Sequence, residues 1–207
     1  MTHPPLSNTF FDRQALTVAK DLIGKVLCSY VKNTWLTAMI IETEAYLLED
    51  KASHGSLGYT EKRKALFMPA GTIYMYYARG ADSLNFSVKG EGAAVLIKSG
   101  VPYIDQQSSN NMLEIMHELN PNKNGTRRED MKLCSGQTLL CRALNLKVRE
   151  WDQKSIDTER FYIVDVNYKP EKIIRAARLG IPEGRDEHLL YRFVDQKFTT
   201  YCTRPAK

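Results

Sequence analysis

The sequence predicts one mixed α+β domain. Short apolar segments with the two-residue period of strands alternate with turn signals, and segments with the helical period lie before and after them. No internal repeat, linker or low-complexity tract divides the 207 residues, of which 43% are hydrophobic. That length and composition suffice for one substantial core. We therefore interpret 1–207 as a single domain in which 1–8 is a flexible lead-in.

In the first half of the chain the patterns predict one helix and five strands. The helix is expected over 12–23, with Leu16, Ala19 and Leu22 on its apolar face and Gly24 at its end. The polar segment 47–66 separates two groups of strands, and a loop of that length is usually functional or mobile. The strands are expected over 25–31, 35–44, 71–78, 84–88 and 93–97, the last three as a meander.

The second half is predicted to hold shorter elements. A basic helix is expected over 172–179, with Gly180 as its end. Further helices are expected over 112–119 and from 135 onward, and strands over 161–166, 191–194 and 198–202.

Charge, apolar runs and cysteine spacing limit the classes of protein to which this chain can belong. The net charge is +5 and the pI about 8.9, which suits phosphate binding but is common among metabolic enzymes. No apolar run reaches the roughly 18–20 residues of a membrane helix, and the start of the chain lacks a secretory signal. The four cysteines form no Cys-x-x-Cys pair, so neither a disulfide scaffold nor a zinc site is expected. We expect a reduced, cytoplasmic protein.

Two carboxylates mark the end of the second predicted strand. Glu42 and Glu44 are two residues apart, so we expect them on one face, with Ile41 and Thr43 on the other. Glu44 is a candidate general base if it lies in a cleft, and a solvated side chain otherwise. The pair is also similar to the two acids of glycosidases, although Glu42 equally suits a buried ion pair.

Aromatic residues follow these carboxylates. Five of the 11 tyrosines fall within 46–77, namely Tyr46, Tyr59, Tyr74, Tyr76 and Tyr77. Their rings suit either a flat, polar, aromatic ligand such as a DNA base or an aromatic sheet core.

His54 and Arg79 are weaker signals. A lone histidine is more often a surface or hydrogen-bonding residue than a catalyst, and no second His or Cys stands at metal-ligand spacing. Arg79 precedes the tip of a predicted hairpin, where it either probes a DNA minor groove or is solvated. No metal site is expected.

Seven blocks of residues, spread over nearly the whole chain, carry a family resemblance. They are Phe10-Phe11-Asp12, Ile41-Glu42-Thr43-Glu44-Ala45-Tyr46, His54, Phe67-Met68-Pro69-Ala70-Gly71-Thr72-Ile73-Tyr74-Met75-Tyr76, Leu84-Asn85, Leu133-Cys134-Ser135-Gly136 and Tyr191-Arg192-Phe193. Together they resemble the alkyladenine (3-methyladenine) DNA glycosylases. The second and fourth blocks in combination are specific.

The resemblance implies a curved antiparallel sheet with surrounding helices and a protruding β-hairpin. It also implies a monofunctional hydrolase of base excision repair that binds double-stranded DNA from the minor-groove side. Such an enzyme flips an alkylated purine into a pocket and hydrolyses its N-glycosidic bond. The implied substrates are 3-methyladenine and 7-methylguanine, with hypoxanthine and ethenoadenine as further candidates. A monomer without cofactor is implied, in the bacterial nucleoid or, in a eukaryote, the nucleus.

By resemblance, Glu44 is the general base that activates water. Tyr46 and Tyr76 are the walls on either side of the flipped base, and His54 is a further wall and hydrogen-bonding group. Asn85 lines the pocket floor and disfavours the exocyclic amino group of guanine. The alternative function is a damaged-DNA-binding protein without catalysis, against which the presence of Glu44 argues.

Two positions depart from the family pattern. Lys98 stands where the family usually has an arginine near the attacking water. Arg79 stands where it usually has the tyrosine wedge that replaces the flipped base, with Tyr77 as the other candidate. We therefore expect the flipped state to depend more on charge and less on wedging.

Overall fold

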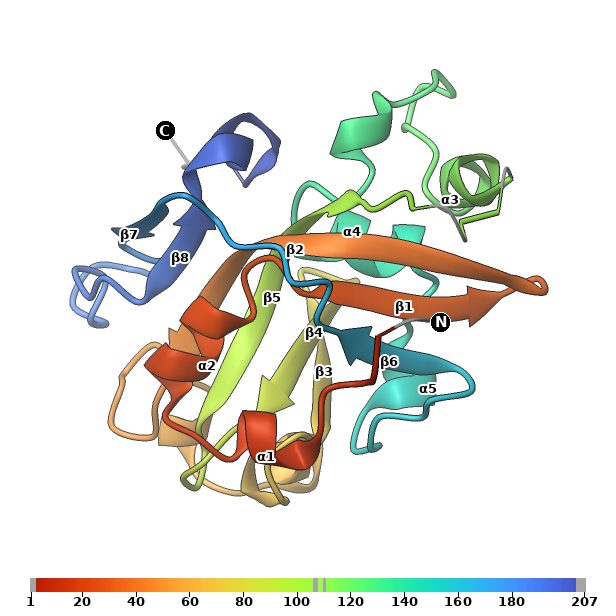
Figure 1. Cartoon of the computed structure of the whole chain (residues 1–207). Coiled ribbons are helices and arrows are strands. Elements are labelled where there is room, and N and C mark those ends of the chain that lie inside the picture. The colour runs from red at the N-terminus through yellow and green to blue at the C-terminus, as the bar shows by residue number, and fades with distance from the viewer. Residues whose placement is uncertain (1–2, 106–107, 110, 204–207) are drawn as a thin grey trace.

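The computed structural model describes residues 3–105, 108–109 and 111–203. An antiparallel sheet lies at the centre in the order β3-β4-β5-β2-β1-β6, while β8 pairs with β2 and β7 with β8 (Figure 1). The strands are β1 (Val26–Val31), β2 (Thr34–Tyr46), β3 (Ile73–Ala78), β4 (Ala81–Ser87), β5 (Ala94–Pro102), β6 (Phe161–Val164), β7 (Ile173–Ala176) and β8 (Arg192–Asp195). This arrangement confirms the predicted α+β fold.

Short helices surround the sheet. The α-helices are α1 (Asn8–Phe11), α2 (Ala15–Asp21), α3 (Met112–Leu119), α4 (Gln137–Ala143) and α5 (Val148–Trp151). The 3-10 helices are η1 (Gly55–Leu57), η2 (Glu61–Phe67), η3 (Asp130–Lys132) and η4 (Gln196–Tyr201). α2 packs against β2 and β5, whereas α4 packs against β4 and β5. Among the described residues, no helix is long and apolar enough to cross a membrane.

The helix predicted over 12–23 is shorter in the structure. It begins at Ala15, after the separate turn of α1, and Gly24 lies beyond its end with a φ of +88°. The Gly24 amide donates to the Ile40 carbonyl at 2.8 Å, and a Cβ on Gly24 would lie 2.6 Å from the Tyr168 ring. Glycine therefore allows the chain to leave the helix at this point and enter β1.

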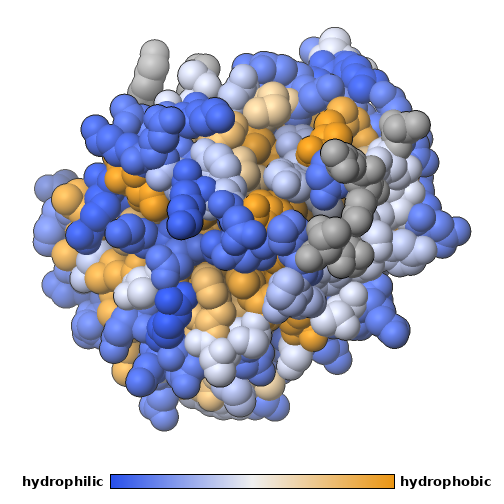
Figure 2. All heavy atoms as spheres, viewed as in Figure 1, coloured by the Kyte–Doolittle hydropathy of each residue, from blue (hydrophilic) through white to orange (hydrophobic). Residues whose placement is uncertain are grey.

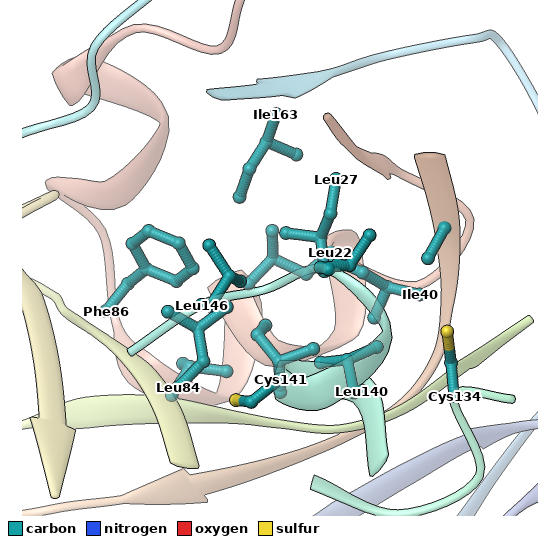
Figure 3. Close-up of a cluster of buried hydrophobic side chains, with 14 of the residues drawn as sticks. Leu22, Leu27, Ile40, Leu84, Phe86, Cys134, Leu140, Cys141, Leu146 and Ile163 are labelled. Carbon is teal, nitrogen blue, oxygen red and sulfur yellow. The ribbon is translucent and has the colours of Figure 1, made fainter. Parts of the chain in front are cut away.

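The main hydrophobic core lies between the sheet and the helices α2 and α4 (Figure 3). Leu22 of α2, Ile40 of β2 and Leu140 of α4 are fully buried, and each such burial contributes about 1.5–3 kcal/mol. Cys134 and Cys141 lie in the same core, where burial raises the pKa of both thiols. Figure 2 shows hydrophilic side chains over most of the outer face drawn there, with apolar groups between them.

A pair of β-bulges in the centre of the sheet decides which way the β2 side chains point. In the pairing of β2 with β5, Ile41 is the extra residue on β2 and Lys98 the extra residue on β5. Ile40 packs in the main core, whereas Ile41 packs in a second cluster on the opposite face. Beyond the bulge Thr43 faces the main core and donates to an α2 carbonyl at 2.7 Å. The expectation that Ile41 shares the face of Thr43 is therefore wrong.

The start of the chain also differs from expectation. The Leu6 amide donates to the Ile163 carbonyl at 2.7 Å, and Pro5 forms a β-bridge with Val164. Residues 5 and 6 thus extend the edge of the sheet at β6, and α1 begins directly after them at Asn8. The flexible lead-in expected over 1–8 is wrong for these residues, and residues 1–2 lie outside the described part.

Two C-terminal predictions are wrong as well. The basic helix expected over 172–179 is the strand β7, which pairs with β8 so that Ile174 lies opposite Val194. The strand expected over 198–202 lies mostly in η4, whose first turn is capped by the Asp195 carboxylate accepting from the Lys197 amide at 3.0 Å. The pairing partner of β7 is distant in sequence, so its local pattern could not indicate a strand.

Candidate active site

A cavity of about 890 Å³ opens along the curved sheet at the end of β2. It is lined by residues of β2, β3, β4 and β5, by the loop after β2 and by the segment 179–185. Six predicted site residues line it: Tyr46, His54, Tyr76, Arg79, Asn85 and Lys98. The structure therefore brings together side chains that the sequence places on separate strands and loops.

Glu44 lies beside this cavity with no exposed surface. Its Oε2 accepts a hydrogen bond from the Tyr46 hydroxyl at 2.7 Å, and its Oε1 accepts one from the Leu179 amide at 3.1 Å. The Lys98 ammonium is 3.4 Å from the carboxylate. The alternative of a solvated glutamate at a hairpin end is therefore wrong, and the carboxylate is held in a fixed orientation.

Tyr46 connects the carboxylate to the cavity wall. Burial, and then the neighbouring Glu44 carboxylate, raise the pKa of its hydroxyl well above the ordinary value. The hydroxyl therefore keeps its proton and remains a donor to Glu44. The Arg178 guanidinium lies 4.6 Å from the centroid of the Tyr46 ring, a cation–π distance.

His54, Tyr74 and Tyr76 form an aromatic group on one side of the cavity. The His54 ring lies edge-on to Tyr76 with centroids 4.5 Å apart, and its Nδ1 is 2.8 Å from the Tyr74 hydroxyl. Burial, followed by the charges of Arg63 and Arg185, lowers the pKa of His54. The imidazole is therefore neutral at physiological pH. Because the Tyr74 hydroxyl forms a hydrogen bond with His54, Tyr74 belongs both to the sheet and to the site.

Asn85 and Lys98 approach the cavity from β4 and β5. Asn85 is almost fully buried, and its side-chain amide donates to the Tyr74 carbonyl at 3.1 Å. Tyr74 also lies directly opposite Asn85 in the β3–β4 pair. The sheet pairing and the side-chain hydrogen bond therefore both fix the position of Asn85. Lys98 is the bulged residue of β5, and bulges commonly redirect a side chain in this way.

The β3–β4 hairpin carries both candidates for the wedge. Its two-residue turn is Arg79-Gly80 with φ values of +50° and +80°, as a type I′ turn requires. Arg79 is exposed at the tip and lines the cavity. Tyr77 is 60% exposed on the opposite strand face from Tyr76 and does not line the cavity. Position therefore favours Arg79 over Tyr77.

The charge around the cavity is strongly asymmetric. The cationic lining residues are Arg79, Lys98, Lys123, Arg128, Arg142 and Arg185, and the described lining includes no carboxylate. The whole chain, by contrast, has 29 basic and 24 acidic residues. The cationic excess is thus concentrated at the cavity, where a polyanion such as DNA finds favourable potential.

Sequence reasoning missed three parts of the site: Asp50, Arg178 and the Leu179 amide. Arg178 and Asp50 form a buried ion pair next to Glu44. Arg178 lies in the segment that local periodicity assigned to a helix, so no pattern indicated its buried partner. Among the described residues, no three His, Cys, Asp or Glu side chains are grouped to hold a metal ion.

Comparison with known proteins gives a consistent result. The chain matches the family model described as Methylpurine-DNA glycosylase (MPG) over residues 9–198. A relative from Pseudomonas aeruginosa (strain LESB58), carrying the name 3-methyladenine DNA glycosylase, is 61% identical over 200 residues, covering 97% of this chain and 84% of the relative. The DNA-3-methyladenine glycosylase of Mus musculus is 33% identical over 184 residues, covering 85% of this chain and 54% of the mouse protein. The chain therefore belongs to the methylpurine-DNA glycosylase family and is a DNA glycosylase, a hydrolase of base excision repair.

Proposed function

We propose that this enzyme flips alkylated purines out of duplex DNA and hydrolyses their N-glycosidic bonds without a subsequent lyase step. The observation that carries the proposal is Glu44, a fully buried carboxylate beside an aromatic cavity of about 890 Å³ with a cationic lining. That volume lies within the range of roughly 300–1,000 Å³ that is usual for small-molecule sites. A purine with its sugar is a ligand of suitable size, and it reaches such a cavity only when it leaves the base stack.

The expected substrates are 3-methyladenine and 7-methylguanine, whose rings carry a positive charge. Tyr46 and Tyr76 stack on the flipped base, and their π-faces favour a cationic ring over a neutral one. Asn85 lies at the floor, where it disfavours the exocyclic amino group of normal guanine. The cationic lining binds backbone phosphates from the minor-groove side of a monomeric complex.

In the reaction, Glu44 orients a water molecule and takes its proton as the water oxygen bonds to C1′ of the sugar. The C1′–N bond breaks, and its electrons neutralise the positive charge of the departing base. Tyr46 and the Leu179 amide hold the carboxylate during this step, and the Lys98 ammonium lies next to the attacking oxygen. No further acid is needed when the base is already cationic.

Neutral bases such as hypoxanthine and ethenoadenine need a proton on the leaving base. His54 is the imidazole of the cavity wall, but its lowered pKa leaves it without that proton at neutral pH. We therefore expect neutral lesions to be excised more slowly than cationic lesions.

Arg79 is the proposed wedge, and its guanidinium plane fills the space that the flipped base leaves in the stack.

Excision from oligonucleotides carrying each lesion tests the proposal. Wild-type enzyme should release methylated purines, and Glu44→Gln should lose roughly 10²–10⁴-fold in excision rate because the general base is removed. The variant should still bind the damaged duplex, since the cavity remains. Retained excision by Glu44→Gln would remove Glu44 from the mechanism, and a wild-type enzyme that releases no alkylated purine would overturn the function.

A further inference from the structure

Arg178 is a buried cation at the edge of the site. Its side chain is 0% exposed and that of its partner Asp50 is 1% exposed. The guanidinium donates through both terminal nitrogens to the two Asp50 oxygens, one of them at 2.9 Å, and also to the Ala45 carbonyl at 3.0 Å. It lies between two aromatic rings, with centroid distances of 4.6 Å to Tyr46 and 5.3 Å to Tyr191.

This ion pair lies outside the helices and strands of the fold. Asp50 belongs to the loop after β2, and Arg178 to the segment after β7, so the pair joins two irregular segments across the end of β2. Burying an ion pair contributes little net stability, because the desolvation cost offsets most of the attraction. The pair does, however, fix the relative position of two segments that would otherwise be free to shift.

Both oxygens of Glu44 depend on groups that Arg178 fixes. The Leu179 amide, which donates to Oε1 at 3.1 Å, belongs to the next residue of the chain. The Tyr46 hydroxyl, which donates to Oε2 at 2.7 Å, belongs to the ring on which the guanidinium stacks. One side chain therefore adjoins the donors of the two shorter hydrogen bonds to the carboxylate, while Lys98 is the third donor, at 3.4 Å.

We propose that Arg178, held by Asp50, is a positioning residue that sets the orientation of Glu44 and of the Tyr46 wall. The inference rests on the proposed function. Arg178 does not line the cavity, so it acts on substrate only through these neighbours. The planar fork of arginine makes this possible, because it binds the carboxylate, the carbonyl and the two rings at the same time.

The charge of Arg178 also affects base selection. A cation stacked on Tyr46 lowers the attraction of that ring for a second cation, and the alkylated base is such a cation. Removal of Arg178 should therefore slow excision of neutral hypoxanthine more than excision of 7-methylguanine. A purely structural role would lower the rate for both lesions by the same factor.

The experiment compares Arg178→Met, Arg178→Lys and Asp50→Asn with wild type under single-turnover conditions, on duplexes carrying 7-methylguanine or hypoxanthine. The excision rate should fall on the order of 100-fold in Arg178→Met, because small displacements of a catalytic group have effects of that size. The excision rate of Arg178→Lys should fall too, since an ammonium cannot donate to both Asp50 oxygens in the planar geometry of a guanidinium. Affinity for the damaged duplex should change little, and the ratio of the two rates should move towards the cationic lesion.

Arg192→Met is the matched control. Like Arg178, Arg192 is a buried arginine paired with a carboxylate. Its side chain donates to Glu42 of β2 and to the Thr203 carbonyl, and not to the groups around Glu44. This variant should lose stability and keep its excision rate per folded molecule, as judged by circular dichroism. Equal rate losses in Arg192→Met and Arg178→Met would overturn the inference, and so would wild-type rates in folded Arg178→Met.

The remaining outcomes are also decisive. If Arg178→Met does not fold, the same criteria apply to Arg178→Lys and Asp50→Asn, which retain a polar group at each position. Excision by wild type with no loss in these variants would reject the positioning role alone. No excision by wild type would instead reject the proposed function.

Discussion

Glu42 and Glu44 lie two residues apart on one face of β2, and neither has any exposed surface. Glu42 accepts hydrogen bonds from Arg192 Nε at 2.6 Å, the Ser99 hydroxyl at 2.5 Å and the Thr203 amide at 2.8 Å. Its charge is therefore matched by a guanidinium in direct contact. This set of contacts connects β2 with β5, β8 and the last described residues of the chain.

Glu44 has a looser set of partners. It accepts from a neutral hydroxyl and a backbone amide, and its nearest cation, Lys98, is 3.4 Å away. Its partners Tyr46, Lys98 and Leu179 all line the cavity, whereas Arg192 and Ser99 beside Glu42 do not. Burial therefore does not distinguish a structural carboxylate from a proposed catalytic one. The distance to the cationic partner and the place of the surrounding side chains along the cavity do.

The largest expected effect separates the two residues by stability. Glu42→Ala should lower the free energy of unfolding by about 3–5 kcal/mol, because Arg192 remains buried without its partner. Glu44→Ala should cost less, since Lys98 reaches the cavity and its water. Urea unfolding of both variants measures the difference. Equal losses would show that the two carboxylates contribute equally to stability and that the charge partner of Glu42 has no special structural role.

Ser99→Ala should produce a smaller effect confined to the Glu42 side. The Ser99 hydroxyl donates to Glu42 and accepts from the Gly136 amide at 3.0 Å. Removing it leaves that amide without its acceptor, which costs about 1–3 kcal/mol. Thermal unfolding should show the loss while the single-turnover excision rate of the folded enzyme stays the same. A fall in that rate would extend the influence of the Glu42 contacts into the active site.

Arg79→Ala should give the smallest effect on stability and act instead on DNA binding and on the flipped state. The side chain is exposed at the hairpin tip, so unfolding should be unchanged. If Arg79 contacts a phosphate, the slope of log affinity against log salt should decrease by about 1. Arg149→Ala is the control, because Arg149 is 79% exposed and does not line the cavity. Identical salt slopes for both variants would remove Arg79 from the DNA contact surface.

Much of the fold follows from local patterns. Alternating apolar residues predicted the five strands β1 to β5, and the helical period predicted α3 over 112–119. The pattern failed for β7, where Ile173 and Ile174 become strand residues only by pairing with β8. It also failed at Ile41, because a bulge arises from the pairing of two strands and leaves no mark in either one.

The site residues also fall into a group that local patterns predict and a group that they do not. Glu44, Tyr46, Tyr76 and Asn85 stand at strand positions, so their meeting follows once the strand order is known. His54 lies in a loop, and its contacts with Tyr74 and Tyr76 explain its position. Arg178 could not be predicted at all, because its partners come from a distant loop and two separate tyrosines.

The double bulge at Ile41 and Lys98 also limits how the enzyme can be redesigned. If β2 kept all its residues but lost this bulge, the two faces of β2 beyond Ile40 would be exchanged, since side chains alternate along a regular strand. Glu42 and Glu44 would then enter the apolar layer under α2, and Thr43 would take their place at the cavity. Variants with new base preferences should therefore come from substitutions in β2, while changes of chain length belong in surface loops away from the cavity, such as 158–160.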